Sequence, residues 1–450
     1  MRSPGPDKVD DGTGANAGDD TGGSTPTRAP GVLHAQLHRA TTAEDHSLRA
    51  ITGLLVLSDD APASLEPRLT LSGRPLDVTW GRPSPRTAGR FAGAARAGEA
   101  GFVAGGLDIA GPVELSVRHP GTEERQILAR RRVRPPGAKA QRLLAVVHER
   151  LAQEAARPAD QRDPASYGEL RALLYEVRPA ARHNQWQRLG LEVDGVFLKK
   201  PQRAFKQMRE LSEAHLAEGT GAEFDAWFEG YRRLIHPRAL AYYGYPTALD
   251  SRDDAWVWDC VGQVTQAVAA LGHEAFVVSG TLLGVTREGG LVPHDSDVDM
   301  ALLLHAGSLD ELADEWVQLR GRLAQAGILN ASYVNTGKRL YKLRLPNDFG
   351  CDLFPAWEID GRVSIWPHTH EVDPASVLPL STREVRGVEV RVPQVPEDVL
   401  TCNYGPGWRT PDPLFEFDWA GAKERFATFI TATEPPSAPA QVPTGSLPRL

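Results

Sequence analysis

Cysteine is scarce in this sequence, with only Cys260, Cys351 and Cys402 among 450 residues. Their wide spacing excludes a Cys-x-x-Cys zinc site and a disulfide framework. Long apolar runs are also missing, since no stretch approaches the roughly 20 residues that cross a bilayer. Residues 1–20 lack the apolar core of a signal peptide. We therefore predict a cytoplasmic protein whose contact with the inner face of the membrane is peripheral at most.

Positive charge is in short supply as well. Lys and Arg number 50 against 58 Asp and Glu, which gives a formal net charge of −8. Proteins that bind nucleic acid irrespective of its sequence rely on Lys and Arg to neutralise the phosphates. We therefore do not expect a nucleic-acid polymer as a partner. A small phosphorylated substrate needs only a local cationic site and is compatible with this balance.

The chain divides into segments of different composition. The two ends, 1–31 and 433–450, have too few apolar residues to offset the entropy of ordering, so we predict that both are disordered. Short apolar runs with period two fill 32–136 and are typical of a β-sandwich-like accessory domain. Apolar residues then recur at helical spacing over 137–250, which predicts a helical region.

Helical and strand-like patterns alternate over 251–432, as expected for an α/β domain. We expect helices over 255–271 and 309–326, and strands over 275–278, 298–304, 341–345 and 351–354. This segment also contains the residues whose pattern points to chemistry.

Two acids of this segment, Asp297 and Asp299, lie two residues apart at the start of the apolar run 298–304. On a strand they share a face, with Cα atoms roughly 7 Å apart. They would repel one another unless a cation lay between them. Oxygen ligands favour Mg²⁺ or Mn²⁺ over zinc. A lone Asp-x-Asp is more often a solvated loop, but such a loop does not normally lead directly into a buried strand.

A third acid and a glycine turn strengthen this interpretation. Asp352 stands within the apolar run 351–354, where a carboxylate is costly unless it is paired or bound to a metal. Gly280 and Thr281 lie between an apolar run and a helix-like stretch, an arrangement that presents backbone N–H groups to a phosphate. Together these residues predict a metal-dependent site for phosphoryl transfer.

Several motifs occur in one order between Val278 and Pro411. They are Gly280-Thr281-Leu282-Leu283-Gly284, Arg287, Pro293-x-Asp295-x-Asp297-x-Asp299, Asp352-Leu353-Phe354-Pro355 and Tyr404-Gly405…Trp408…Pro411. This order resembles the LicD family, which includes bacterial phosphocholine transferases and fukutin-related protein. The resemblance implies a polymerase-β-like nucleotidyltransferase fold for 251–432. His294 stands where the family usually has Trp.

The resemblance also implies roles for the acids. Asp297, Asp299 and Asp352 would be the catalytic residues and would hold the Mg²⁺ or Mn²⁺ that bridges the phosphates of an activated donor. Asp352 either takes the proton from the attacking hydroxyl or serves only as a metal ligand. His368 and His370 are interpreted as a surface pair and not as ligands, because the sequence shows no third ligand beside them.

Five further residues are candidates for substrate binding. Gly280 and Thr281 would contact a donor phosphate, and Arg287 would stabilise its charge unless it forms a plain surface ion pair. Asp295 would orient the acceptor or cap the local structure. Lys342 would face either the donor or the solvent, because its strand alternates between charged and apolar residues.

The expected function is metal-dependent transfer of a phospho-alcohol, either a polyol phosphate or phosphocholine. The donor would be a CDP-activated small molecule, and the acceptor a hydroxyl of a cell-surface glycan or its lipid-linked precursor, with release of CMP. Two alternatives stay open. One is an Asp-x-Asp glycosyltransferase, which would release a nucleoside diphosphate. The other is a non-catalytic glycan-binding protein that works through its β-rich domain.

Overall fold

The computed structural model describes residues 29–433 apart from 43–47, 85–86, 88–90, 92–93, 106, 108–109, 123, 331–338 and 347–348. Most of the two ends predicted to be disordered lies outside the described residues. The chain forms two compact units, 1–231 and 232–450, each of which is described by itself. No helix in the described part is long and apolar enough to span a membrane.

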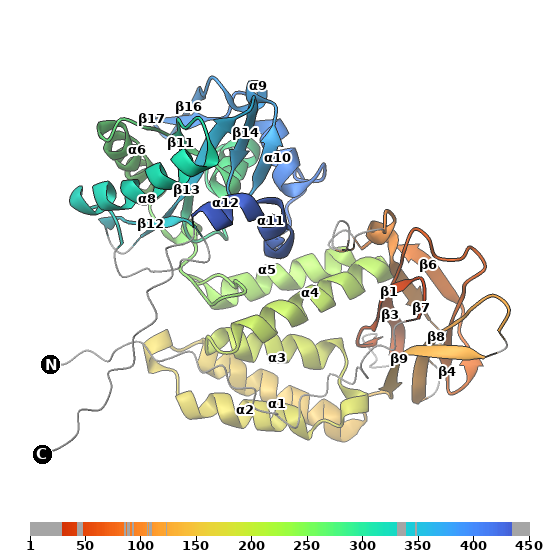
Figure 1. The fold of residues 1–450 in the computed structure, drawn as a ribbon. Coiled ribbons are helices and arrows are strands. Elements are labelled where there is room, and N and C mark those ends of the chain that lie inside the picture. Colours follow the sequence, from red (N-terminus) through yellow and green to blue (C-terminus); the bar gives the residue numbers. More distant parts are fainter. Residues whose placement is uncertain are drawn as a thin grey trace, which may run out of the picture. The chain divides into compact units, whose positions relative to one another are not determined.

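The first unit begins with two antiparallel sheets (Figure 1). One sheet has the order β1-β3-β7-β6 with β2 paired to β3, and the other has the order β5-β4-β8-β9. The strands are β1 (Val32–Leu37), β2 (Thr41–Thr42), β3 (Leu48–Leu57), β4 (Glu66–Leu71), β5 (Arg74–Pro75), β6 (Val78–Arg82), β7 (Gly101–Ala104), β8 (Gly111–Arg118) and β9 (Arg125–Val133). Both sheets contribute to one core, in which Ile51, Leu69, Phe102 and Leu115 are fully buried. The predicted β-rich N-terminal region is confirmed.

Five long helices follow the two sheets and confirm that the middle region is helical. They are α1 (Ala138–Ala155), α2 (Pro164–Glu176), α3 (Asn184–Val196), α4 (Pro201–Glu218) and α5 (Gly221–Ile235). On α1 the apolar residues Leu144, Val147 and Leu151 are buried on one face, as their helical spacing requires. Helix α4 contacts the first sheet, where Arg82 Nε donates a hydrogen bond to the carbonyl of Ala217 at 2.6 Å. The β-rich and helical regions therefore pack together in one unit.

The second unit is built on a mixed sheet with the order β10-β11-β13-β14-β15, in which β12 also pairs with β13. Its strands are β10 (Glu274–Val277), β11 (Val298–Leu304), β12 (Tyr341–Arg344), β13 (Gly350–Ile359), β14 (Arg362–Ile365) and β15 (Thr369–Val372). Strands β11 and β13 are parallel, and the other pairs are antiparallel. Strand β11 has the bounds expected from the sequence.

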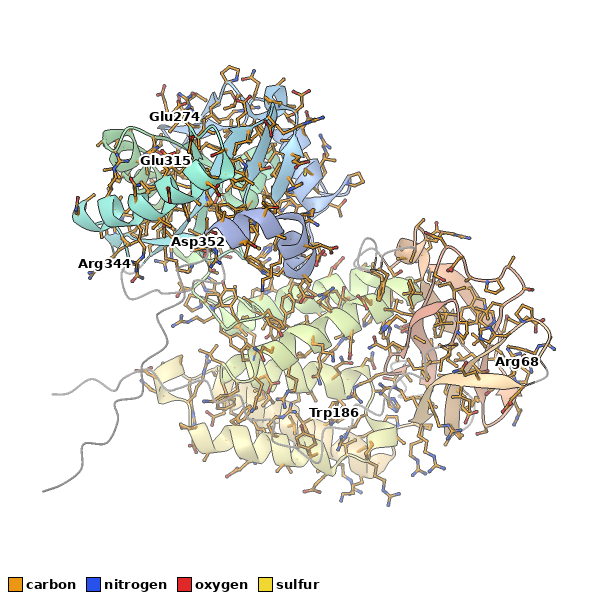
Figure 2. All side chains as sticks on the ribbon, viewed as in Figure 1. Arg68, Trp186, Glu274, Glu315, Arg344 and Asp352 are labelled. Atoms are coloured by element: carbon orange, nitrogen blue, oxygen red, sulfur yellow. The ribbon has the colours of Figure 1, made fainter. Side chains whose placement is uncertain are left out.

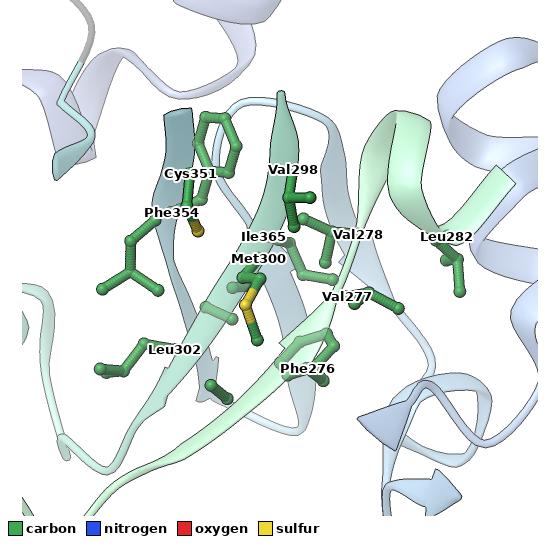
Figure 3. Close-up of a cluster of buried hydrophobic side chains, with 14 of the residues drawn as sticks. Phe276, Val277, Val278, Leu282, Val298, Met300, Leu302, Cys351, Phe354 and Ile365 are labelled. Carbon is green, nitrogen blue, oxygen red and sulfur yellow. The ribbon is translucent and has the colours of Figure 1, made fainter. Parts of the chain in front are cut away.

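Helices and a hairpin pack around this sheet. They are α6 (Asp254–Ala270), α7 (Ser279–Leu283), α8 (Leu309–Gln325), α9 (Pro374–Val377), α10 (Pro396–Tyr404), α11 (Trp419–Arg425), α12 (Ala427–Ala432) and the hairpin β16 (Ser381–Val385) and β17 (Val388–Val392). Helix α6 contacts β10, and α8 contacts β11 and β13. Figure 3 shows the apolar side chains of β10, β11 and β13 gathered in one cluster, with Phe276, Met300 and Cys351 almost fully buried. This packing fixes which faces of the strands point inward.

His215 on α4 is a fully buried histidine of the first unit. Its Nε2 lies 3.0 Å from Nη2 of Arg188, and its Nδ1 lies 2.8 Å from Oγ1 of Thr220. A guanidinium only donates hydrogen bonds, so Nε2 must accept and the ring must be neutral. Burial, together with the charge of Arg188, lowers the pKa of His215 to about 4.

Because of the lowered pKa of His215, we expect the first unit to become less stable as the pH falls. Between its folded pKa and the usual value of 6.5 the unfolded chain binds the extra proton, so the free energy of unfolding falls as pH is lowered. The free energy of unfolding, measured by urea unfolding, should fall between pH 7 and pH 5 by about 2 kcal/mol less in His215→Gln than in the unaltered protein. His148→Gln, at an exposed position on α1, is the control and should leave this fall unchanged. An unaltered pH dependence in His215→Gln would contradict this account.

Candidate active site

Three of the candidate residues lie side by side on neighbouring strands of the mixed sheet. Asp299 on β11 pairs with Asp352 on β13, and Asp352 pairs in turn with Lys342 on β12. Figure 2 labels Asp352 on this sheet, with Arg344 on the adjacent strand β12. Side chains at paired positions project from the same face of a sheet. The strand register therefore brings two carboxylates and an ammonium group together from distant parts of the sequence.

The ammonium group of Lys342 contacts two carboxylates. It forms a close ion pair with Oδ1 of Asp352 and lies 3.7 Å from Oδ2 of Asp297. The Lys342 side chain is 26% exposed and that of Asp352 is 11% exposed, so water screens this attraction only in part. Lys342 thus faces the acids, and its charge balances part of theirs.

The turn at Gly280 and Thr281 is joined to the same acids. The Gly280 N–H donates to Oδ2 of Asp299 at 3.2 Å, and the Asp299 N–H donates to Oγ1 of Thr281 at 2.8 Å. A Cβ atom added at Gly280 would lie 2.4 Å from Oδ2 of Asp295. No side chain fits at that distance, so residue 280 must be glycine for Asp295 to approach the turn. The structure therefore gathers Gly280, Thr281, Asp295 and Asp299 in one place.

Negative charge accumulates at this place. Partial burial raises the pKa of Asp295 to about 6, and the charge of Asp352 adds to this effect. Partial burial likewise raises the pKa of Asp299 well above its usual range, with further contributions from Asp297, Asp295 and Asp352. Lys342 is one positive group beside four carboxylates. A further cation would relieve their repulsion.

The acids of this site have the ligand atoms that a divalent cation prefers, but they are not arranged as a complete coordination shell. Within the described residues, no three Asp, Glu, His or Cys side chains converge closely enough to ligate a metal ion. The available donors of Asp297, Asp299 and Asp352 are nevertheless all carboxylate oxygens, the kind that Mg²⁺ and Mn²⁺ prefer. The negative charge of these acids has the sign that attracts a cation.

Arg287 occupies a different position from the acids. It lies in the π-helical turn Gly284–Glu288 that follows α7. Its Nη1 donates to the carbonyl of Trp408 at 3.0 Å, and its Nε lies 2.7 Å from Oε1 of Glu288. Arg287 therefore forms an ion pair through a side chain that is itself only 12% exposed, and it also tethers the turn to the C-terminal motif around Trp408.

Sequence reasoning missed a polar cluster directly before the glycine turn. Ser279 is buried and has a φ of 49°, in the left-handed region that L-residues seldom adopt. Its Oγ lies 3.2 Å from Nε2 of His368 and 3.3 Å from the hydroxyl of Tyr404. Strained residues of this kind concentrate at functional sites. The serine next to the Gly-Thr pair was the only local signal in the sequence.

The expectation that His368 and His370 form a surface pair is wrong for His368. Its ring lies 5.3 Å from that of Phe354 and 4.8 Å from that of Phe417, and burial lowers its pKa to about 3. The ring of His370 instead packs 4.7 Å from that of Phe426. The two histidines have different aromatic neighbours, with His368 at the end of the turn before β15 and His370 within that strand.

Comparison with known proteins identifies the part of the chain that contains this site. Residues 272–395 match the family described as LicD/FKTN/FKRP, nucleotidyltransferase domain. This segment is a LicD domain. It includes the glycine turn, the acids 295–299, Lys342 and Asp352, and the family is one of glycan-modifying transferases. No curated protein matches the chain.

Lys342 offers a direct test of the charge balance in the LicD domain. Lys342→Met leaves Asp297 and Asp352 without their ammonium partner, so the variant should lose about 2 kcal/mol of stability, or a few °C in Tm, in buffer that contains a chelator. Millimolar Mg²⁺ or Mn²⁺ should raise the Tm of the variant by more than that of the unaltered protein.

The matched control is Arg344→Met on the same strand, where the side chain is exposed. It should change neither the Tm in chelator nor the response to metal. Equal metal responses of Lys342→Met and the unaltered protein would show that these carboxylates do not form a cation site.

Proposed function

We propose that the LicD domain transfers a phospho-alcohol, either a polyol phosphate or phosphocholine, from a CDP-activated donor to a hydroxyl of a cell-surface glycan or its lipid-linked precursor. CMP is the second product. One observation carries the proposal, namely the alignment of Asp299, Asp352 and Lys342 on three neighbouring strands beside the Gly280 turn. The proposed location is the cytoplasm, with peripheral contact at most to the inner face of the membrane.

The architecture supports a nucleotidyltransferase fold for this unit. The parallel strands β11 and β13 carry their acids near their first residues, at Asp299 and Asp352. Helix α7 follows β10 directly and places the glycine turn against β11. A turn and two strand acids at one end of a sheet form a compact place for a phosphate and its counterion.

Asp297, Asp299 and Asp352 are the residues proposed to hold Mg²⁺ or Mn²⁺. When bound, such an ion neutralises the charge that builds up on the donor phosphates. The ion pair with Lys342 restrains the carboxylate of Asp352, which favours the role of ligand over that of proton acceptor. Thr281 and Lys342 are the proposed contacts of the donor, and Asp295 orients the acceptor hydroxyl.

The bond changes follow from phosphoryl transfer. The acceptor oxygen forms a bond to the phosphorus next to the alcohol while the bond from that phosphorus to the CMP oxygen breaks, and the hydroxyl proton leaves to a carboxylate or water. Attacking and leaving oxygens must lie roughly in line. The protein contributes position and charge more than covalent chemistry. The acids and the glycine turn supply both.

The identity of the released nucleotide tests the proposal. The full chain should be incubated with Mg²⁺ and a panel of CDP- and UDP-activated alcohols and sugars, and the nucleotides separated by chromatography. We expect CMP from a CDP-alcohol. A nucleoside diphosphate as the stoichiometric product would contradict the proposal and indicate a glycosyltransferase, and no turnover of any donor would favour a non-catalytic glycan-binding protein.

Substitution of the acids should stop the reaction without unfolding the protein. Asp297→Asn, Asp299→Asn and Asp352→Asn should each lower the rate by at least about 100-fold, because each removes a charge from the proposed cation site. A chelator should abolish CMP release, and Mg²⁺ or Mn²⁺ should restore it. Asp314→Asn, at an exposed position on α8, is the control. Full activity of any one site variant would remove that residue from the site.

A further inference from the structure

A hairpin over residues 237–248, here called the tyrosine hairpin, lies outside the segment that matches the family. Ala241 and Gly244 exchange backbone hydrogen bonds of 3.0 and 3.2 Å, which makes Tyr242 and Tyr243 the two central residues of its tight turn. Tyr242 is 51% exposed and Tyr243 is 68% exposed. Tyrosine side chains tend to be enclosed in a folded protein, so two at one exposed tip indicate a contact surface.

The tyrosine hairpin is attached to the acidic run of the LicD domain. The Leu249 N–H donates to the carbonyl of Asp295 at 2.7 Å, and the Asp250 N–H donates to the carbonyl of Pro293 at 3.1 Å. The Tyr243 hydroxyl lies 3.0 Å from Oγ of Ser296, between two of the acids in sequence. These contacts hold the Tyr243 ring at the edge of the carboxylate cluster while most of the ring stays open to solvent.

The chemistry of this edge matches a sugar. A pyranose ring has an apolar face of C–H groups that packs on an aromatic ring, and its hydroxyls donate to carboxylates. Both partners are present here, because Asp295 and Asp297 flank the residue that holds Tyr243. The hairpin tip carries two exposed tyrosine side chains on which such a face can pack.

We propose that Tyr243 is the stacking platform for the sugar ring of the acceptor and places an acceptor hydroxyl at the acidic run. The inference rests on the proposed transfer to a glycan, and it adds a specificity-determining residue that lies outside the matched family segment. The glycine turn contacts Asp295 and Asp299, whereas Tyr243 contacts Ser296. Donor and acceptor would therefore approach the acidic run by different residues.

Saturation-transfer difference NMR tests the platform directly, with methyl hexopyranosides, N-acetylhexosaminides and their disaccharides as probes in Mg²⁺. At least one probe should bind the full chain, with the strongest saturation at its ring C–H protons. Tyr243→Ala should weaken that binding by about fivefold or more, as expected for loss of one stacking contact. Tyr243→Phe keeps the aromatic face and should retain most of the binding.

CMP binding, measured by calorimetry on the same proteins, separates the two substrates. It should be equal in the unaltered protein, Tyr243→Ala and Tyr243→Phe. A loss of CMP affinity in Tyr243→Ala would overturn the inference in favour of a nucleobase platform. Binding of no saccharide, or equal saccharide binding by Tyr243→Ala, would overturn it as well. Tyr243-dependent saccharide binding without turnover of any CDP-donor would instead contradict the proposed function and leave the platform in place.

Discussion

The pairing of Asp299 with Asp352 across the parallel strands β11 and β13 is the constraint on which the rest of the site depends. Their neighbours Val298, Met300 and Cys351 are almost fully buried, so a shift of one residue in register would turn the carboxylates into the apolar core. The hydrophobic packing of the sheet therefore holds two like charges together. The close ion pair of Lys342 and the N–H of Gly280 offset part of that repulsion.

Other parts of the second unit are joined to these acids. Gly280 allows Asp295 to approach the turn, Ser279 connects that turn to His368 and Tyr404, and Arg287 links the next turn to the C-terminal motif. Carboxylates gathered in this way repel one another, which costs stability. Burial first, and the neighbouring carboxylates second, raise the pKa of Asp295 to about 6 and that of Asp299 well above its usual range.

Local patterns in the sequence predict the strands that carry the acids. They predict only in part that these acids lie close together in the fold. The apolar run 298–304 became β11 unchanged, because a buried strand has a continuous apolar signature. The run 351–354 forms only part of the longer strand β13 (Gly350–Ile359). Strand β11 pairs with one edge of β13, and β12 and β14 pair with the other edge. Such pairing between distant segments leaves no local pattern. The same holds for Ser279, whose partners lie 89 and 125 residues away.

The tyrosine hairpin is also not predicted from the sequence, because residues 237–248 follow a long helical pattern and are grouped with it. Only backbone pairing between Ala239 and Pro246 and at the tip reveals the turn. The contact between Tyr243 and Ser296 places the exposed tip of the hairpin beside the acidic run. A motif that the sequence displays thus lies beside an accessory element that the fold brings to it.

The proposed transfer of a phospho-alcohol is tested most directly by determining which atom of the donor is attacked. When no acceptor is present, water can take its place, and the full chain would slowly hydrolyse a CDP-alcohol in water enriched in the heavy oxygen isotope. Mass spectrometry of the products then locates the new oxygen. Attack at the phosphorus next to the alcohol places the heavy oxygen in the alcohol phosphate and leaves CMP unlabelled, as the account predicts. Heavy oxygen in CMP, or in a free alcohol released with CDP, would contradict it.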